Sequence, residues 1–380
     1  MNIIAVDAMT CECGIEEVVK GSLLALENND LSIILTGDKE KIKPILKNYS
    51  IDSHILENDS LNYNKQNKIK TLDKSLINDI RKASEDSRIS IFHAEDIISM
   101  RDKPWLVRTK KDSSIVRAMY LLKNDVADAV VSAGNSGATA AAAYIYVGLI
   151  ESLKKRQKKK EKRPSTKVPI ICEVPFLSKD GSCAIADVGA NPDCNEHNIA
   201  QYALLLTSYL KAAKNIEKPL IAQLTIGEED YKGSSLDRKA FSLLEKLSDK
   251  GAINYIGNKE PDDVLLGEAD GYVCDAKTGN IFIKTAEAFC KLRYPKADET
   301  AVISHNTLNI CEKYSGSLCL GINKPVVITH GRSNADSLHH SIMFTNRCAD
   351  VIEEVNTQSN KLLQTYMPML TKWYSLLHRE

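Results

Sequence analysis

One turn in this chain combines the residue types that receive an anion. An apolar, strand-like run leads into the turn, and a helix rich in alanine follows it. Glycine lets the backbone approach a ligand closely, and the first N–H groups of a helix have no acceptor within it, so the turn predicts a phosphate site. An ordinary capped helix would use the same residue types, and the turn alone leaves both interpretations open. The residues concerned are Ser132, Gly134, Asn135, Ser136 and Gly137.

Polar residues also follow most other strand-like runs. Because the carboxyl ends of parallel strands share one edge of a sheet, and ligands bind outside that edge, we expect these loops to converge on one cleft. The loops are residues 7–9, 36–38, 187–191, 225–229, 275–280 and 330–334.

The elements that must position these loops alternate along the chain. Short β-branched runs are separated by amphipathic stretches, which is typical of βαβ units and predicts an α/β fold with a mostly parallel sheet. We expect one domain over residues 1–350 and a helical tail over 351–380. The strands are expected at residues 3–7, 31–36, 89–93, 127–132, 168–174, 183–187, 220–225, 253–256, 271–274 and 326–329.

Composition narrows the class of protein. The 380 residues are 43% hydrophobic, with 50 basic and 50 acidic side chains, yet residues 154–167 carry a local charge of +8. The ten cysteines form no C-x-x-C pair, which predicts reduced thiols in a cytoplasmic protein, and Cys11 and Cys13 lack partners at zinc-ligand spacing. Because Cys11 and Cys13 lack such partners, we expect no metal site. The first residues show no basic region and no cleavage signal, so we expect no secretion leader. No apolar run approaches about 20 residues, so we also expect no membrane span.

Taken in order, these loops resemble the PlsX-type phosphate acyltransferases of bacterial phospholipid synthesis. The resemblance extends over nearly the whole chain and depends on eight segments in register. These are residues 4–9, 110–114, 132–138, 187–191, 226–229, 253–258, 278–285 and 330–334.

The resemblance implies that long-chain acyl-[acyl carrier protein] and inorganic phosphate react to acyl phosphate and free carrier protein, for phosphatidic acid synthesis. It also implies a three-layer α/β/α sandwich, like that of the isopropylmalate dehydrogenases and phosphate acetyltransferases, used as a homodimer. No cofactor is expected, and the chain contains no G-x-G-x-x-G or P-loop pattern. No nucleic acid is expected as a partner.

The site residues follow from this chemistry. Phosphate needs to be oriented against a thioester carbonyl, and the tetrahedral oxyanion needs preorganised donors. Lys284 and His330 are the candidates for charge stabilisation or for protonating the leaving thiolate, with Asn191 as an oxyanion donor. The structural alternative for His330 is a side chain that caps or hydrogen-bonds its loop, and for Lys284 it is a lysine on a helix surface. The predicted phosphate ligands are Ser132, Gly134, Asn135, Ser136, Gly137, Asp187, Arg332 and Asn334, and the predicted carrier-protein contacts are Arg108, Lys110 and Lys111.

Three segments depart from the family pattern. Thr10-Cys11-Glu12 stands where the family has Gly-Gly-Asp, and Asp275-Ala276-Lys277 stands where it has Asp-Gly-Phe. The helical hairpin of the family is shortened to residues 286–313, with a proline-bearing polar middle that suits a membrane poorly. The basic run 154–167 instead predicts contact with acidic carrier protein or anionic lipid, unless it is a solvated tip.

Two other functions stay open from the sequence. One is a phosphate acetyl- or butyryltransferase that uses coenzyme A, and the other is a catalytically impaired descendant that binds carrier protein or lipid. The altered loops at residues 10–12 and 276–277 motivate the second alternative. Dehydrogenase activity is disfavoured, because the chain has neither a nucleotide motif nor a suitable aspartate cluster.

Overall fold

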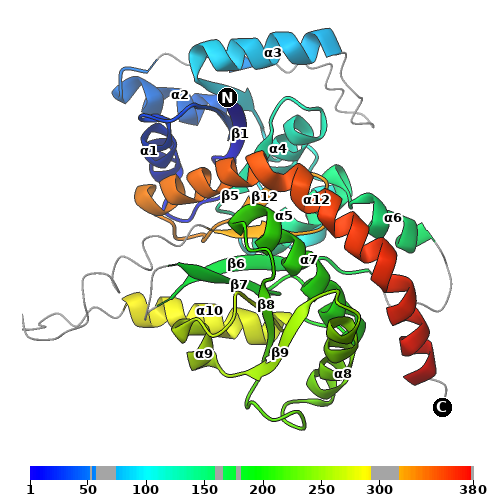
Figure 1. The fold of residues 1–380 in the computed structure, drawn as a ribbon. Helices are drawn as coiled ribbons and strands as arrows, with labels where there is room; N and C mark the ends of the chain where they lie inside the picture. Colours follow the sequence, from blue (N-terminus) through cyan, green and yellow to red (C-terminus); the bar gives the residue numbers. More distant parts are fainter. Residues whose placement is uncertain (52–53, 57–73, 159–165, 177–180, 292–315, 378–380) are drawn as a thin grey trace, which may run out of the picture. The chain divides into compact units, whose positions relative to one another are not determined.

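A computed structural model describes residues 1–51, 54–56, 74–158, 166–176, 181–291 and 316–377. The chain forms two compact units. Unit 1 contains Met1–Gly148 and Ser315–Ile352, and unit 2 contains Leu149–Tyr314 and Glu353–Glu380. Each unit is an α/β fold built on its own set of strands (Figure 1).

The strands of unit 1 run in the order β3-β4-β2-β1-β5-β12-β11. All neighbours are parallel except β11 and β12, which pair antiparallel. β2 is buried along its whole length, as expected for a central parallel strand covered on both faces. The strands are β1 (Asn2–Asp7), β2 (Leu31–Gly37), β3 (His54–Leu56), β4 (Ile89–His93), β5 (Ala129–Ser132), β11 (Ser317–Cys319) and β12 (Val326–Ile328).

Helices cover both faces of the unit 1 sheet. The right-handed crossover rule places α1 and α2 on one face, because they lead from β1 towards β3, and α3 and α4 on the other, because they lead back towards β5. The start of α12 packs on α1, where a side chain at Gly21 would collide with Leu338. The helices are α1 (Ile15–Leu26), α2 (Lys39–Asn48), α3 (Lys74–Ser87), α4 (Ser114–Lys123), α5 (Ser136–Ala142) and α12 (Ala335–Leu377).

The strands of unit 2 run in the order β6-β7-β10-β8-β9, parallel except for the β6–β7 pair. They are β6 (Ile170–Pro175), β7 (Ser182–Ala186), β8 (Leu220–Leu224), β9 (Asn254–Lys259) and β10 (Gly271–Val273).

Two helical layers also cover unit 2. α7 and α8 lie side by side (Figure 1), and the crossover rule places α9 and α10 on the opposite face. α6 is fixed to the last part of α12, since Ser152 N–H and Oγ both donate to Asn360. The helices are α6 (Glu151–Lys158), α7 (Glu196–Lys214), α8 (Ser235–Asp249), α9 (Pro261–Leu266) and α10 (Ala276–Lys291).

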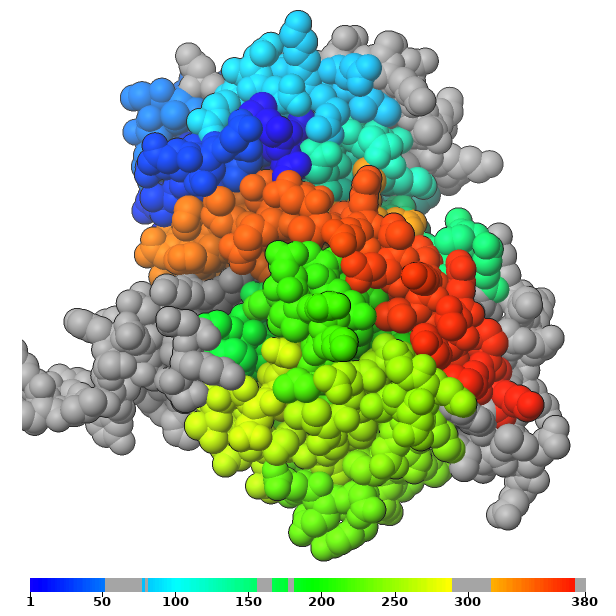
Figure 2. All heavy atoms as spheres, in the orientation of Figure 1, coloured from blue at the N-terminus to red at the C-terminus, as the bar shows by residue number. Residues whose placement is uncertain are grey.

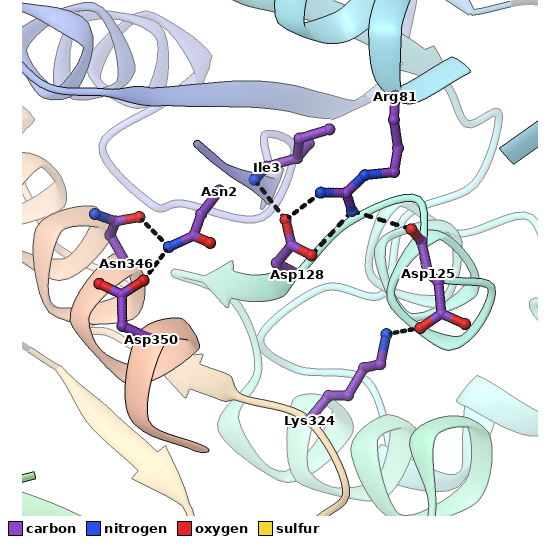
Figure 3. A network of polar contacts seen from close by, with 8 residues as sticks. All are labelled: Asn2, Ile3, Arg81, Asp125, Asp128, Lys324, Asn346 and Asp350. Atoms are coloured by element: carbon purple, nitrogen blue, oxygen red, sulfur yellow. Dashed lines mark hydrogen bonds and ion pairs between the residues drawn. The ribbon is translucent and has the colours of Figure 1, made fainter. Parts of the chain in front are cut away.

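A polar network ties the amino ends of the unit 1 strands to the helices around them (Figure 3). Asp128 accepts two bonds from the Arg81 guanidinium of α3, at 2.9 and 3.0 Å, and one from the Ile3 N–H of β1. Asn2 donates to Asn346 and Asp350 of α12. The network therefore joins segments that are far apart in the sequence.

α12 belongs to both units, because it begins in unit 1 and continues beyond Ile352 into unit 2. Figure 2 shows α12 in orange and red at the surface. Glu353, Glu354 and Lys361 of this helix are exposed. Within the described part of the chain, no helix is both long and apolar enough to cross a bilayer.

The predicted α/β class with a mostly parallel sheet is confirmed, and all ten predicted strands are present with slightly shifted ends. The sequence missed β3 and β11, which have three residues each. The single domain over 1–350 with a tail over 351–380 stays a prediction. Residues 292–313 of the predicted hairpin and 159–165 of the basic run lie outside the described residues.

Candidate active site

The topology of unit 1 indicates one position where a ligand is expected to bind. The chain leaves β1 towards β2 on one side and reaches β5 on the other, so the strand order reverses between these neighbours. Ligands of open α/β sheets bind outside the carboxyl ends of the strands at such a point. The last residues of the two strands, Asp7 and Ser132, are directly paired.

Asp7 organises this point through its carboxylate. Its Oδ2 accepts hydrogen bonds from Thr10 Oγ1 at 2.6 Å and from Ser132 Oγ at 2.8 Å, and all three side chains are buried. Ser132 Oγ in turn accepts from Gly134 N–H at 3.1 Å. A Cβ at Gly134 would lie 2.2 Å from Thr10 Oγ1, so glycine is required here. Thr10, which departs from the family pattern, is thus built into the turn.

Asn135 is the cap of α5 and also an anchor. Its Oδ1 accepts from Ala138 N–H, and its Nδ2 donates to the carbonyls of Ser99, Met100 and Asp102. Both ends of this amide are therefore occupied. The sequence proposed it as a phosphate ligand, and in this structure it positions the turn instead.

The backbone of the same turn is left available. Ser136 and Gly137 are exposed, and no described atom accepts a bond from the N–H groups of Asn135, Ser136 or Gly137. Unsatisfied N–H groups beside two glycines form a setting for an anion.

The loop after β12 adjoins this turn, because Thr329 N–H donates to Ser132 O and Gly331 lies against Met100. Arg332 is 81% exposed, and its Nε lies 2.9 Å from Oε2 of Glu12. Glu12 N–H donates to Gly331 O, which holds residues 10–13 onto this loop.

The two other predicted residues of this loop differ in their surroundings. His330 follows β12 and is partly buried. Asn334 is exposed and caps α12, since its Oδ1 accepts from Ser337 N–H at 2.9 Å. The first N–H of α12, at Ala335, is taken by Glu17, so this helix start offers little to an anion.

The predicted carrier-protein residues divide into two kinds. Lys110 is committed internally, since its Nζ donates to Ile97 O at 2.8 Å and lies 3.7 Å from Asp102. Arg108 is exposed, and Lys111 is partly buried. Arg108 is therefore the member of this set that is most open to a partner.

Unit 2 has a switch point of its own between β7 and β10, and Asp187 follows β7 there. Its carboxylate is buried and accepts from the N–H groups of Ile170, Gly189, Ala190 and Asn191 and from Asn191 Nδ2. Burial raises the pKa of Asp187, and these hydrogen bonds act in the opposite direction.

Asp187 and Asn191 thus form hydrogen bonds within their own loop and with its neighbours, and they do not point into an open site. Asn191 Nδ2 donates to Val168 O and to Asp187, so both of its amide hydrogens are used. The oxyanion role that the sequence proposed for Asn191 has no free donor in this arrangement. Asp187, a predicted phosphate ligand, accepts hydrogen bonds from the N–H groups of its own loop.

The start of α10 is fixed to the same loop. Asp275 caps the helix through the Lys277 and Thr278 N–H groups, and a Cβ at Gly279 would lie 2.1 Å from Asp187 O. Lys284 lies one turn further along and is exposed. The altered segment 275–277 therefore forms a regular helix cap, and Lys284 is placed on the surface of α10.

Unit 1 brings together Ser132, Gly134, Asn135, Ser136, Gly137, His330 and Arg332, while unit 2 brings together Asp187 and Asn191. The described ranges contain no group of three His, Cys, Asp or Glu side chains arranged to hold a metal ion. The sequence left Thr10 and Pro104 out of the site. Thr10 lies against Gly134 and Pro104 lies against Gly137. The two glycines were the sequence signal that other residues pack closely at this turn.

The family model described as "Fatty acid synthesis protein" matches residues 59–294. The phosphate acyltransferase of Dictyoglomus turgidum is 33% identical over 372 residues, covering 93% of this chain and 95% of that protein. The chain belongs to the phosphate acyltransferase family. It is an enzyme of this type, as the resemblance in its sequence implied.

Solved structures agree on the fold of this phosphate acyltransferase family member. A phosphotransacetylase from Streptococcus pyogenes superposes with a TM-score of 0.56 at 16% identity, covering 93% of this chain and 94% of that one. A phosphotransacetylase from Staphylococcus aureus gives a TM-score of 0.54, also at 16% identity, covering 92% and 94%. At such low identity these likenesses establish the fold alone.

Proposed function

We propose that this enzyme transfers a long-chain acyl group from acyl carrier protein to inorganic phosphate, and that the acyl phosphate serves phosphatidic acid synthesis. The observation that carries the proposal is the turn after β5, where Asp7, Thr10 and Ser132 fix the backbone and the Ser136 and Gly137 N–H groups stay open. Family membership supports the reaction type.

In the proposed reaction, hydrogen phosphate is held by the open N–H groups, with Arg332 beside them as a cation for its oxygens. One phosphate oxygen attacks the thioester carbonyl. The new O–C bond forms, the C–S bond breaks, and the proton of hydrogen phosphate ends on the carrier thiolate. His330 is the proposed carrier of that proton, because an imidazole can both accept and donate a proton and this residue follows the adjoining strand.

Asp7 acts as a positioning residue in this scheme. A carboxylate that faced phosphate would repel it. The Asp7 carboxylate instead accepts hydrogen bonds from the hydroxyls of Thr10 and Ser132, so it is bonded within the protein. Lys284, Asn191 and Asp187 in unit 2 stay predicted site residues, and Lys284 is tested separately below.

The test is release of free carrier thiol from palmitoyl-[acyl carrier protein], with acyl phosphate trapped as the hydroxamate. We expect both products to appear in equal amounts and only with phosphate. The His330→Ala variant should lose at least tenfold in kcat, whereas His340→Ala on α12 should not. Lys284→Ala is compared with Lys277→Ala, an exposed lysine of the same helix. Thiol release that does not depend on phosphate would contradict the proposal.

The same assay separates the coenzyme A alternative. Acetyl- and butyryl-coenzyme A replace the acylated carrier protein at equal concentration. A higher kcat/KM with either short thioester than with palmitoyl-[acyl carrier protein] would make the enzyme a short-chain phosphate acyltransferase. The homodimer, the cytoplasmic location and the contact of residues 154–167 with anionic lipid stay predictions.

A further inference from the structure

Trp105 is an unusual surface residue of unit 1. It lies in a 3-10 turn, Pro104–Arg108, and is 58% exposed. The Lys103 ammonium is 5.1 Å from the centre of its ring, which is within cation–π range. Tryptophan and arginine are enriched where proteins contact each other, because a rigid aromatic ring contributes a large area at low entropic cost.

The exposed charged side chains of residues 100–111 are all basic. Arg101, Lys103 and Arg108 are exposed, and no acid other than Asp102 occurs between residues 100 and 111. Asp102 accepts from Ser99 N–H and lies 3.7 Å from Lys110, and the Ser99 hydrogen bond helps to lower the pKa of its carboxyl. Its charge is therefore used within the loop. We call Arg101, Lys103, Trp105 and Arg108 the Trp105 surface.

The Trp105 surface is held rigidly to the turn after β5. Asn135 donates to the carbonyls of Ser99, Met100 and Asp102, and Gly137 is closely approached by Pro104, since a Cβ there would lie 2.8 Å from Pro104 Cγ. At the other end, Tyr146 Oη donates to Val107 O at 2.6 Å. A partner on this surface would thus be located directly beside the open N–H groups.

We propose that the Trp105 surface is the docking site of the protein that delivers the acyl thioester, and that this protein presents an acidic face around its thioester-bearing arm. The inference rests on the proposed function. Charge complementarity selects an acidic partner, the exposed ring supplies an apolar contact within the cationic rim, and the tether to the turn directs the thioester towards phosphate. Lys110 has no part in it, because its ammonium is already bonded.

The test compares steady-state constants for palmitoyl-[acyl carrier protein] and for phosphate. In Trp105→Ala and in the Arg101→Glu/Lys103→Glu double variant we expect KM for the acylated carrier protein to rise at least tenfold. The KM for phosphate and kcat should stay within twofold of wild type. Lys123→Glu, an exposed lysine in the last turn of α4, is the matched control and should behave as wild type. Raised ionic strength should weaken carrier binding in wild type more than in the double variant.

Three outcomes would overturn the inference. The first is an unchanged KM for the carrier substrate. The second is an equal rise in the Lys123→Glu control. The third is binding to vesicles of anionic phospholipid that the double variant loses while its KM is unchanged, which would make the surface a lipid contact.

A separate readout distinguishes failure of the docking site from failure of the proposed function. The chain has two tryptophans, so Trp373→Phe leaves Trp105 as the single one. A saturable change in its fluorescence on adding palmitoyl-[acyl carrier protein], absent with the acyl group on coenzyme A, would support docking even if no acyl phosphate forms. Full turnover without any such change would leave the function intact and remove the docking site.

Discussion

Buried carboxylates at two strand ends act on backbone and hydroxyl groups rather than on a ligand. Asp7 accepts from two hydroxyls, and Asp187 accepts from the N–H groups of its own loop. In both places a short acidic side chain fixes the shape of a glycine-containing loop. These two carboxylates therefore fix the shape of their loops, and in the described structure the donors left open beside Asp7 are the backbone N–H groups of Ser136 and Gly137.

Glu12 is predicted to compete with phosphate for Arg332. An exposed ion pair is worth about 0.2–1 kcal/mol, so releasing the guanidinium in Glu12→Gln should lower KM for phosphate by about 1.4- to 5-fold. The free energy of unfolding should change by less than about 0.5 kcal/mol. Initial-rate measurements at varied phosphate test this, and Arg332→Ala should raise the same KM. A higher KM in Glu12→Gln would show that the carboxylate assists binding.

Cys11 and Cys13 are predicted to differ strongly in reactivity. Burial raises the pKa of the Cys11 thiol to about 11, so at pH 8 it stays protonated and is a poor nucleophile, whereas Cys13 is exposed. Brief treatment with iodoacetamide followed by peptide mass spectrometry should find Cys13 alkylated and Cys11 intact. Equal labelling of both would mean that residues 10–13 leave the His330 loop in solution.

At the scale of elements, the helices are fixed by a few polar contacts at strand ends. Arg81 joins α3 to β5 through two parallel bonds to Asp128, and less than a third of either side chain is exposed. Arg81→Lys keeps the charge but loses the fork, and we expect a loss of about 1 kcal/mol in urea unfolding, with about 2 kcal/mol for Arg81→Ala. Lys82→Ala, on the exposed side of α3, is the control. Equal stability of Arg81→Ala and the control would contradict the network in Figure 3.

The contact of α12 with α1 gives unit 1 a sensitivity to acid. Burial, followed by repulsion from His340, lowers the pKa of His339. Above its ordinary value of about 6.5 the ring is neutral in both states and contributes nothing. As the pH falls below that value, the unfolded chain binds a proton that the folded protein does not, so stability decreases until the lowered pKa is passed.

His339→Gln should therefore flatten the loss of stability between pH 6.5 and lower values. Thermal unfolding of wild type and variant at matched pH values measures this difference. Besides His340, the groups acting on the ring are Asp336, Glu27 and the backbone carbonyl of Leu24, and all three favour the charged form. Parallel curves for the two proteins would place the acid sensitivity elsewhere.

At the scale of the whole molecule, the sequence predicts the fold better than the site. Strand ends such as Asp7 and Ser132 can be predicted from the sequence because β-branched runs stop there. β3 and β11 have three residues each, which is too short for a recognisable alternation of apolar and polar residues. The tether from Asn135 to residues 99–102 and the exposure of Lys284 depend on tertiary packing, which no local pattern encodes. For the same reason the role of Thr10 was not predictable, although Gly134 beside it was.

Unit 1 is predicted not to fold from its N-terminal segment alone. Residues 1–148 lack β12, which pairs with β5, and the start of α12, which packs on α1. A fragment of residues 1–148 should show no cooperative transition in urea by circular dichroism. Adding a synthetic peptide of residues 315–352 should restore a transition. A cooperative transition for the fragment alone would contradict the prediction.

The bonds from Asn2 to Asn346 and Asp350 also set an order of events during protein synthesis. The first strand receives these contacts only after Asn346 and Asp350 have left the ribosome, roughly 20–70 s after the strand was made at 5–20 residues per second. During that interval the side of α1 around Gly21 lacks the start of α12 that packs on it. This side of α1 is therefore exposed on the nascent chain for that interval, which is when a chaperone could bind it.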